Sequence, residues 1–204
     1  MKVAIIGGGA AGFFAAFSAK EHPDAEVSIF EKTDKLLSKV KISGGGRCNV
    51  THACFQVNSL SKSYPRGAKP LKKAFDQFQP KDTIAWFSKR GVGLKTESDG
   101  RMFPISDDSQ TIIDCFLHEA RIQNVRIIKK SVVRQLIKEN RGYTLCLEDS
   151  KYFFDKVIIA TGGSPKIEGF QWLKNMGHSI VPPLPSLFTF NMPTEPIREL
   201  MGLV

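Results

Sequence analysis

The stretch VAIIGGGAAGFFAAF at residues 3–17 decides the fold, because it joins an apolar run to a glycine turn and an alanine-rich segment. Residues 2–6 are a β-branched run typical of a strand, and the segment from Ala10 to about Glu21 is apolar and typical of a helix. A second strand-like run follows at Glu26–Phe30. The order strand, helix, strand predicts the opening of a doubly wound parallel sheet.

The turn satisfies the pattern G-x-G-x-x-G with Gly7, Gly9 and Gly12. The first glycine permits a tight turn, the second lets the backbone approach a pyrophosphate, and the third lets helix and strand pack closely. The helix N-terminus then faces the phosphates. Glu31 ends the second strand, where a carboxylate can accept hydrogen bonds from ribose hydroxyls and disfavours the 2′-phosphate of NADP at this site. We therefore predict a dinucleotide site, which the pattern leaves open between FAD and NAD.

A second glycine-rich motif is SGGGRCN at residues 43–49. Consecutive glycines leave backbone N–H groups uncovered for an anion, and Arg47 adds a planar cation able to bind phosphate through two hydrogen bonds. A flexible surface loop with a chance arginine is the alternative interpretation.

A third motif, ATGG at residues 160–163, ends a later strand. Small residues such as Thr161 and Gly162 would let the chain pass close to a cofactor bound at the first strand. An ordinary strand-ending turn remains the alternative.

The rest of the chain shows the period of further helices and strands. We predict helices near residues 69–78, 81–89 and 109–122, a hairpin turned at Asp99-Gly100, and strands at residues 125–128, 132–138, 143–147, 151–154 and 156–160. After residue 181 the chain is proline-rich, and residues 187–192 resemble a strand that begins something new. We therefore expect one domain at residues 1–184 and the start of an inserted domain at residues 185–204.

Length and composition are those of a globular protein with one sizeable core: 204 residues, 42% hydrophobic and 24% charged.

The four cysteines match neither a disulfide scaffold nor a dithiol motif, and no spacing indicates a metal site, so we assign no metal. A signal peptide is rejected because three glycines would interrupt its apolar segment. We expect a cytoplasmic protein with no membrane partner. We also expect Phe13, Phe14 and Phe17 to pack the first helix on the sheet.

Charge is unevenly distributed along the chain. The net charge is +9, and the stretch from Lys35 to Phe75, with its last basic residue at Lys73, holds nine basic residues and no acidic ones. Such a field attracts polyanions, which include a dinucleotide pyrophosphate, nucleic acid and an acidic membrane surface. A solvated basic face is the alternative.

With these motifs in order, the chain resembles the YhiN/BaiN-type flavoprotein family, a branch of the NAD(P)/FAD-dependent oxidoreductases. The matching stretches are VAIIGGGAAG, the EK after the second strand, KISGGGRCNVTH, DGRMFPIS, VIIATGGSP and GHSIVPPLPSLFTF. SGGGRCN followed by a threonine is the most specific of them. The resemblance implies an α/β fold, a Rossmann-like FAD-binding domain with a glutathione-reductase-like three-layer parallel sheet and added antiparallel strands.

The resemblance also implies FAD as cofactor. The implied positions are Gly7, Gly9, Ala11, Gly12, Glu31, Lys39, Gly44 and Arg47, with Val133 flanking the adenine; Lys32, Thr161 and Gly162 complete the candidate set.

The reaction that the resemblance suggests is reduction of a conjugated C=C bond with NAD(P)H as electron donor. The substrate would be a small-molecule enone of steroid type or a uridine in ribosomal RNA, and the basic stretch from Lys35 to Lys73 favours RNA on physical grounds. Two alternatives stay open: an amine or small-molecule oxidase that uses oxygen, and a non-catalytic flavin- or nucleotide-binding module. The sequence assigns no catalytic residue.

Overall fold

The computed structural model describes residues 1–164, 166–184 and 194–200, and the contacts within it divide the chain into two units, residues 1–162 and 163–204. The predicted strand at residues 187–192 lies outside the described residues. The assignment of residues 1–184 and 185–204 to two domains therefore stays a prediction.

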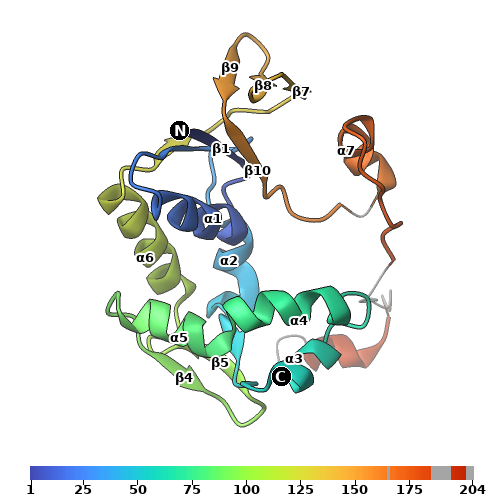
Figure 1. Ribbon diagram of the computed structural model, residues 1–204. Helices are drawn as coiled ribbons and strands as arrows, with labels where there is room; N and C mark the ends of the chain where they lie inside the picture. The colour runs from blue at the N-terminus through green and yellow to red at the C-terminus, as the bar shows by residue number, and fades with distance from the viewer. Residues whose placement is uncertain (165, 185–193, 201–204) are drawn as a thin grey trace. The chain divides into compact units, whose positions relative to one another are not determined.

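A four-stranded parallel sheet forms the centre of the first unit (Figure 1). Its strands, in spatial order, are β10 (Lys156–Ile159), β1 (Lys2–Ile6), β2 (Glu26–Phe30) and β6 (Arg126–Ile128). In β1, every residue after the first is buried. Such a continuous apolar run is typical of a parallel strand that is covered on both faces.

Two helices cover one face of this sheet: α1 (Ala10–Lys20) and α6 (Ser109–Ile122). Side chains alternate between the faces of a strand, so Ile5 and Ile29 share the face that carries the helices and belong to the same buried cluster as Phe13. Phe13 is fully buried, and its ring stacks on that of Phe116 with centroids 6.1 Å apart. The predicted packing of Phe13 on this core is confirmed.

The opposite face of the sheet is covered by an antiparallel sheet. Its strands are β7 (Gln135–Lys138), β8 (Tyr143–Cys146) and β9 (Lys151–Phe154). The ring of Phe30 at the end of β2 packs against Tyr152 and Phe154 of β9, with centroids 5.8 and 5.6 Å away. Helices, parallel sheet and antiparallel sheet make three layers, which confirms the predicted fold class.

A second antiparallel sheet lies beside the helices. It consists of β3 (Thr51–His52), β5 (Arg101–Pro104) and β4 (Leu94–Thr96), in that order. The β4–β5 hairpin turns at Gly100, which has φ +86°. The hairpin was predicted from its Asp-Gly turn, and the structure confirms it.

Several short helices complete the described chain. They are α2 (Ser38–Ile42), a 3₁₀ turn (Ser43–Gly46), α3 (Val57–Lys62), α4 (Ala68–Gln77) and α5 (Pro80–Ser88) in the first unit, and two 3₁₀ turns (Ile167–Phe170, Pro196–Leu200) and α7 (Gln171–Asn175) in the second. The sequence predicted α4 and α5 but not α2 or α3, because helices of five or six residues are too short to show a helical period. Among the described residues, no helix has the length and apolar character needed to cross a membrane.

We predict that Phe13→Ala lowers the free energy of unfolding by about 3–5 kcal/mol, because it leaves a cavity between α1, α6 and the sheet. The control is Ile122→Ala, which trims a side chain that is 59% exposed at the end of α6 and should change stability by less than about 0.5 kcal/mol. Urea denaturation of both variants measures the difference. Equal stabilities would show that Phe13 does not belong to the core.

Candidate dinucleotide-binding site

The glycine turn brings three strands and one helix into close contact. Gly7 has φ +118°, its N–H donates to the carbonyl oxygen of Phe30 at 2.8 Å, and a Cβ on it would lie 2.4 Å from the carbonyl oxygen of Ala160. A Cβ on Gly12 would lie 1.9 Å from the carbonyl oxygen of Gly7. Neither position has room for a side chain: Gly7 lets the turn lie against the backbone that follows β10, and Gly12 lets α1 lie against the turn.

Gly9 differs from these two glycines. A Cβ built on it meets no atom within 4 Å, and its backbone is extended at the N-cap of α1. No side chain caps this helix end, and Ala10 and Ala11 in its first turn are exposed. The free N–H groups of the helix N-terminus therefore border an open space suited to an anion, where the sequence predicts a pyrophosphate.

Glu31 stands directly after β2 and is tied to the turn. Its Oε2 accepts a hydrogen bond from Gly8 N–H at 2.9 Å, and its Oε1 accepts from the N–H and the hydroxyl of Thr33, both at 2.9 Å. Partial burial acts to raise the pKa of Glu31, but these hydrogen bonds outweigh it and the pKa is lowered. The carboxylate is therefore charged and fixed in place at neutral pH, with lone pairs left to accept from ribose hydroxyls.

A cavity of about 140 Å³ opens beside Glu31. It is lined by Ile6, Gly7, Phe30, Glu31, Lys32, Ser131, Val132, Val133 and Thr161. Several of these residues were candidates from the sequence, and they come from well-separated segments of the chain. Their convergence on one small cavity with a carboxylate in its wall matches the needs of an adenosine group.

A larger cavity of about 450 Å³ adjoins the N-terminal turn of α1. Its wall is mostly apolar and contains Ala10, Ala11, Phe14, Lys39, Val40, Ser43, Cys48, Asn49, Val50, Phe78, Thr83, Phe87, Ile112 and Phe116. The Nζ atom of Lys39 lies 3.5 Å from the position of a Cβ on Gly162, so these two candidates are neighbours. Within the described part of the chain, no ion-pair partner of Lys39 is found.

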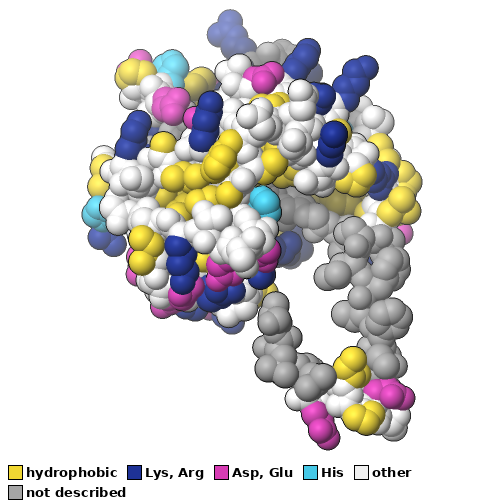
Figure 2. Space-filling view, turned by 90° about the horizontal axis from the view of Figure 1, so that it is seen from below, with side chains coloured by type: hydrophobic (Ala, Val, Ile, Leu, Met, Phe, Trp, Pro, Cys, Tyr) yellow, Lys and Arg dark blue, Asp and Glu magenta, His cyan; other side chains and the backbone are white. Residues whose placement is uncertain are grey.

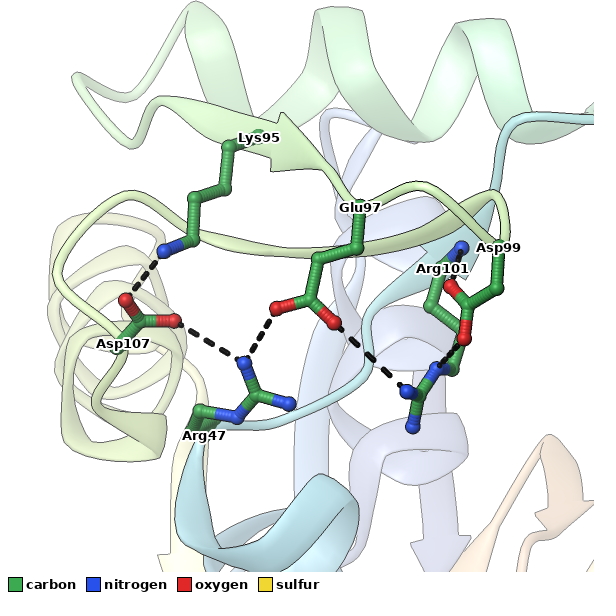
Figure 3. A network of polar contacts seen from close by, with 6 residues as sticks. All are labelled: Arg47, Lys95, Glu97, Asp99, Arg101 and Asp107. Carbon is green, nitrogen blue, oxygen red and sulfur yellow. Dashed lines mark hydrogen bonds and ion pairs between the residues drawn. The ribbon is translucent and has the colours of Figure 1, made fainter. Parts of the chain in front are cut away.

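The structure places Arg47 among carboxylates rather than in the wall of either cavity (Figure 3). Its Nη1 lies 2.5 Å from Oε1 of Glu97 and 3.6 Å from Oδ1 of Asp107, and its guanidinium lies 4.0 Å from the centroid of the Phe103 ring. Gly44, another candidate, has φ +56° and also contacts Phe103: a Cβ on it would lie 2.7 Å from Cε1 of that ring. Phosphate binding by Arg47 stays a prediction.

Cys48 and Asn49 line the larger cavity but were not candidates from the sequence. Cys48 has φ +63°, and burial raises the pKa of its thiol against the opposing effect of a hydrogen bond with Ser43. The thiol is therefore protonated at neutral pH. Their position within the SGGGRCN motif could have identified both residues, whereas the residues from α5 and α6 gave no such signal.

Together these features define a Rossmann-like dinucleotide-binding domain of the FAD-binding type. The chain belongs to the family described as HI0933-like protein Rossmann domain, whose model matches residues 1–190.

Two curated relatives are similar over almost the whole chain. The 3-dehydro-bile acid delta(4,6)-reductase of Clostridium scindens is 28% identical over 209 residues, which cover 99% of this chain and 50% of the relative. The ribosomal RNA dihydrouridine synthase of Escherichia coli K12 is 29% identical over 207 residues, which cover 98% of this chain and 50% of the relative. The chain thus spans about half the length of these relatives.

Solved structures show the same fold at low identity. A single-substitution variant of FrdA from Escherichia coli quinol fumarate reductase matches with a TM-score of 0.59 and 14% identity, over 82% of this chain and 34% of that chain. Thermovibrio ammonificans THI4 matches with a TM-score of 0.54 and 12% identity, over 85% of this chain and 61% of that chain.

We predict that Glu31→Gln lowers the free energy of unfolding at pH 7 by on the order of 1 kcal/mol, after allowance for solvent screening. A carboxylate whose pKa is lowered by folding stabilises the protein above its unfolded-state pKa, ordinarily 4.5, and this contribution is lost as the pH falls through the lowered folded-state value. The difference between the two proteins should therefore be full at pH 7 and vanish in acid. Urea denaturation between pH 7 and pH 3 measures it, and a pH-independent difference would contradict the assignment.

Proposed function

We propose that the chain forms the FAD-binding part of a flavin-dependent oxidoreductase. The observation that carries this proposal is the open space at Gly9, at the N-terminus of α1. The larger cavity begins at the same helix end, and the smaller cavity, with Glu31 in its wall, adjoins the same glycine turn. Adenosine would occupy the smaller cavity and the pyrophosphate the open space. The larger, mostly apolar cavity suits the uncharged isoalloxazine ring better than the cationic ring of oxidised nicotinamide.

The residues present fit this cofactor in separate roles. The α1 N-terminus would hold the phosphates, Glu31 would orient the ribose, and the ammonium of Lys39 would offset phosphate charge. Thr161 and Gly162 would pass close to the cofactor. When bound, FAD supplies a ring that accepts hydride, and the protein supplies orientation and electrostatics.

For the reaction, we propose reduction of a conjugated C=C bond with NAD(P)H as electron donor. The names of the two curated relatives, a delta(4,6)-reductase and a dihydrouridine synthase, support this class of reaction. The amine oxidase alternative predicts flavin reduction by an amine without NAD(P)H, and the non-catalytic alternative predicts a flavin that no physiological donor reduces.

For the substrate, we propose RNA. Lys62 on α3 and Lys69, Lys72 and Lys73 on α4 are exposed, and Figure 2, which views the molecule from below Figure 1, shows lysine and arginine side chains beside apolar ones. Contacts between lysine side chains and phosphates supply most of the sequence-independent affinity of proteins for nucleic acid. The relative named as a ribosomal RNA dihydrouridine synthase supports the same choice.

Two glycine variants test cofactor binding. We predict that Gly9→Ala keeps the wild-type melting temperature but binds FAD about tenfold or more weakly, because its methyl group enters the space proposed for the pyrophosphate. Gly12→Ala should instead lower the melting temperature, because its Cβ would collide with the backbone of Gly7. Thermal unfolding and flavin fluorescence titration measure both effects. Unchanged FAD affinity in a folded Gly9→Ala protein would count against the site.

A triple lysine variant tests RNA binding. Replacing Lys69, Lys72 and Lys73 by glutamine should reduce the slope of log affinity against log salt by about 1 for each phosphate that the variant no longer binds. The matched control replaces the exposed Lys138, Lys151 and Lys156 of the strands by glutamine, which removes the same charge. Equal reductions in both variants, or no RNA binding at low salt by the wild-type protein, would refute a specific role for α4; in the second case, turnover of a small enone would identify the substrate class.

A further inference from the structure

Six charged residues join the glycine-rich loop to the β4–β5 hairpin (Figure 3). They are Arg47, Lys95, Glu97, Asp99, Arg101 and Asp107. Arg47 contacts Glu97 and Asp107, Lys95 pairs with Asp107, and Arg101 lies 3.8 Å from Glu97. Single exposed pairs contribute little to stability, but in this network each carboxylate near Arg47 also contacts a second cation.

The Phe103 ring lies beneath this network and is fully buried. The guanidinium of Arg47 covers the ring at 4.0 Å, and the backbone at Gly44 approaches the ring so closely that a Cβ would lie 2.7 Å from Cε1. A further contact is the hydrogen bond from Val50 N–H to the carbonyl oxygen of Met102, at 2.8 Å. The loop is therefore fixed to β5 at three points.

Within the loop, two backbone hydrogen bonds close the 3₁₀ turn: Cys48 N–H donates to the carbonyl oxygen of Ser43 at 2.9 Å, and Arg47 N–H donates to that of Gly44 at 3.3 Å. Gly44, Gly45 and Gly46 all have positive φ, and Cβ atoms on Gly45 and Gly46 would meet no neighbour within 4 Å. Ordering consecutive glycines costs more conformational entropy than ordering other residues. The residues that follow, Cys48 and Asn49, line the larger cavity. The contacts of Arg47 therefore lie directly beside residues of the cavity wall.

We propose that Glu97 and Asp107 are positioning residues for the flavin half of the cofactor: they hold Arg47 on Phe103 so that residues 43–50 form the cavity wall before FAD binds. This inference rests on the proposed function. Arg47 then acts through the loop and not as a phosphate ligand. Preorganising the wall strengthens binding because the entropy cost of ordering the loop is then no longer part of the binding free energy.

Comparison of FAD with ADP tests the proposal. Both ligands contain adenosine and pyrophosphate, but FAD alone extends into the larger cavity. Glu97→Gln and Arg47→Gln should each weaken FAD about tenfold and change ADP affinity less than about twofold, with no additional weakening in the double variant. Isothermal titration calorimetry on the purified proteins measures these affinities.

The matched control is Glu148→Gln, which removes a carboxylate paired with Arg134 at 2.7 Å on the β7–β8 hairpin. It makes the same change in charge away from the loop and should leave the binding of both ligands unaffected. If Glu97→Gln fails to fold, Asp107→Asn tests the second contact of Arg47 and should weaken FAD in the same selective way.

Two results would overturn the proposal. In one, Arg47→Gln weakens ADP and FAD equally while Glu97→Gln changes neither, which would make Arg47 a direct phosphate ligand. In the other, neither variant weakens FAD. A wild-type protein that binds neither FAD nor ADP would instead refute the proposed function and this inference with it.

Discussion

The close approach of α1 to the end of β1 is the constraint on which the rest of the site depends. The carbonyl oxygen of Gly7 occupies the place of a Cβ on residue 12, so the helix can reach the sheet only with glycine there. This approach sets Phe13 against Phe116 in the core and leaves the helix N-terminus open at Gly9. It also brings Gly8 N–H to Glu31. Core packing and the candidate cofactor site therefore share one backbone contact.

The basic residues of the acid-free stretch lie in three different environments in the structure. Lys39 lies in the wall of the larger cavity, close to the turn, where it can offset phosphate charge. Arg47 is neutralised by carboxylates that lie outside the acid-free stretch. The lysines of α3 and α4 face solvent and remain available to a polyanion. A net charge of +9 is thus not one continuous field, and local pairing decides which cations can bind a ligand.

Much of the fold was predictable from local patterns, because the β1–α1–β2 unit, the Asp99-Gly100 turn and the apolar face of α6 each carry their signal within a few residues. Glu31 was predictable for the same reason. The partners of Arg47 were not, since Glu97 stands 50 residues away and meets it only through the topology of the hairpin. Neither was the larger cavity, whose walls come from α1, α2, α5, α6 and the loop at residues 43–50. A cation in a glycine-rich loop gives the same sequence signal whether its partner is a phosphate or a carboxylate.

FAD binding by this chain is tested most directly by the visible absorption spectrum of the purified protein, with chromatography of the cofactor released on denaturation. We predict a flavin spectrum and released FAD, or uptake of FAD when it is added to a preparation that has been stripped of it. A well-folded preparation that holds no flavin and takes up none would contradict this prediction, and the glycine turn would then have to serve another nucleotide.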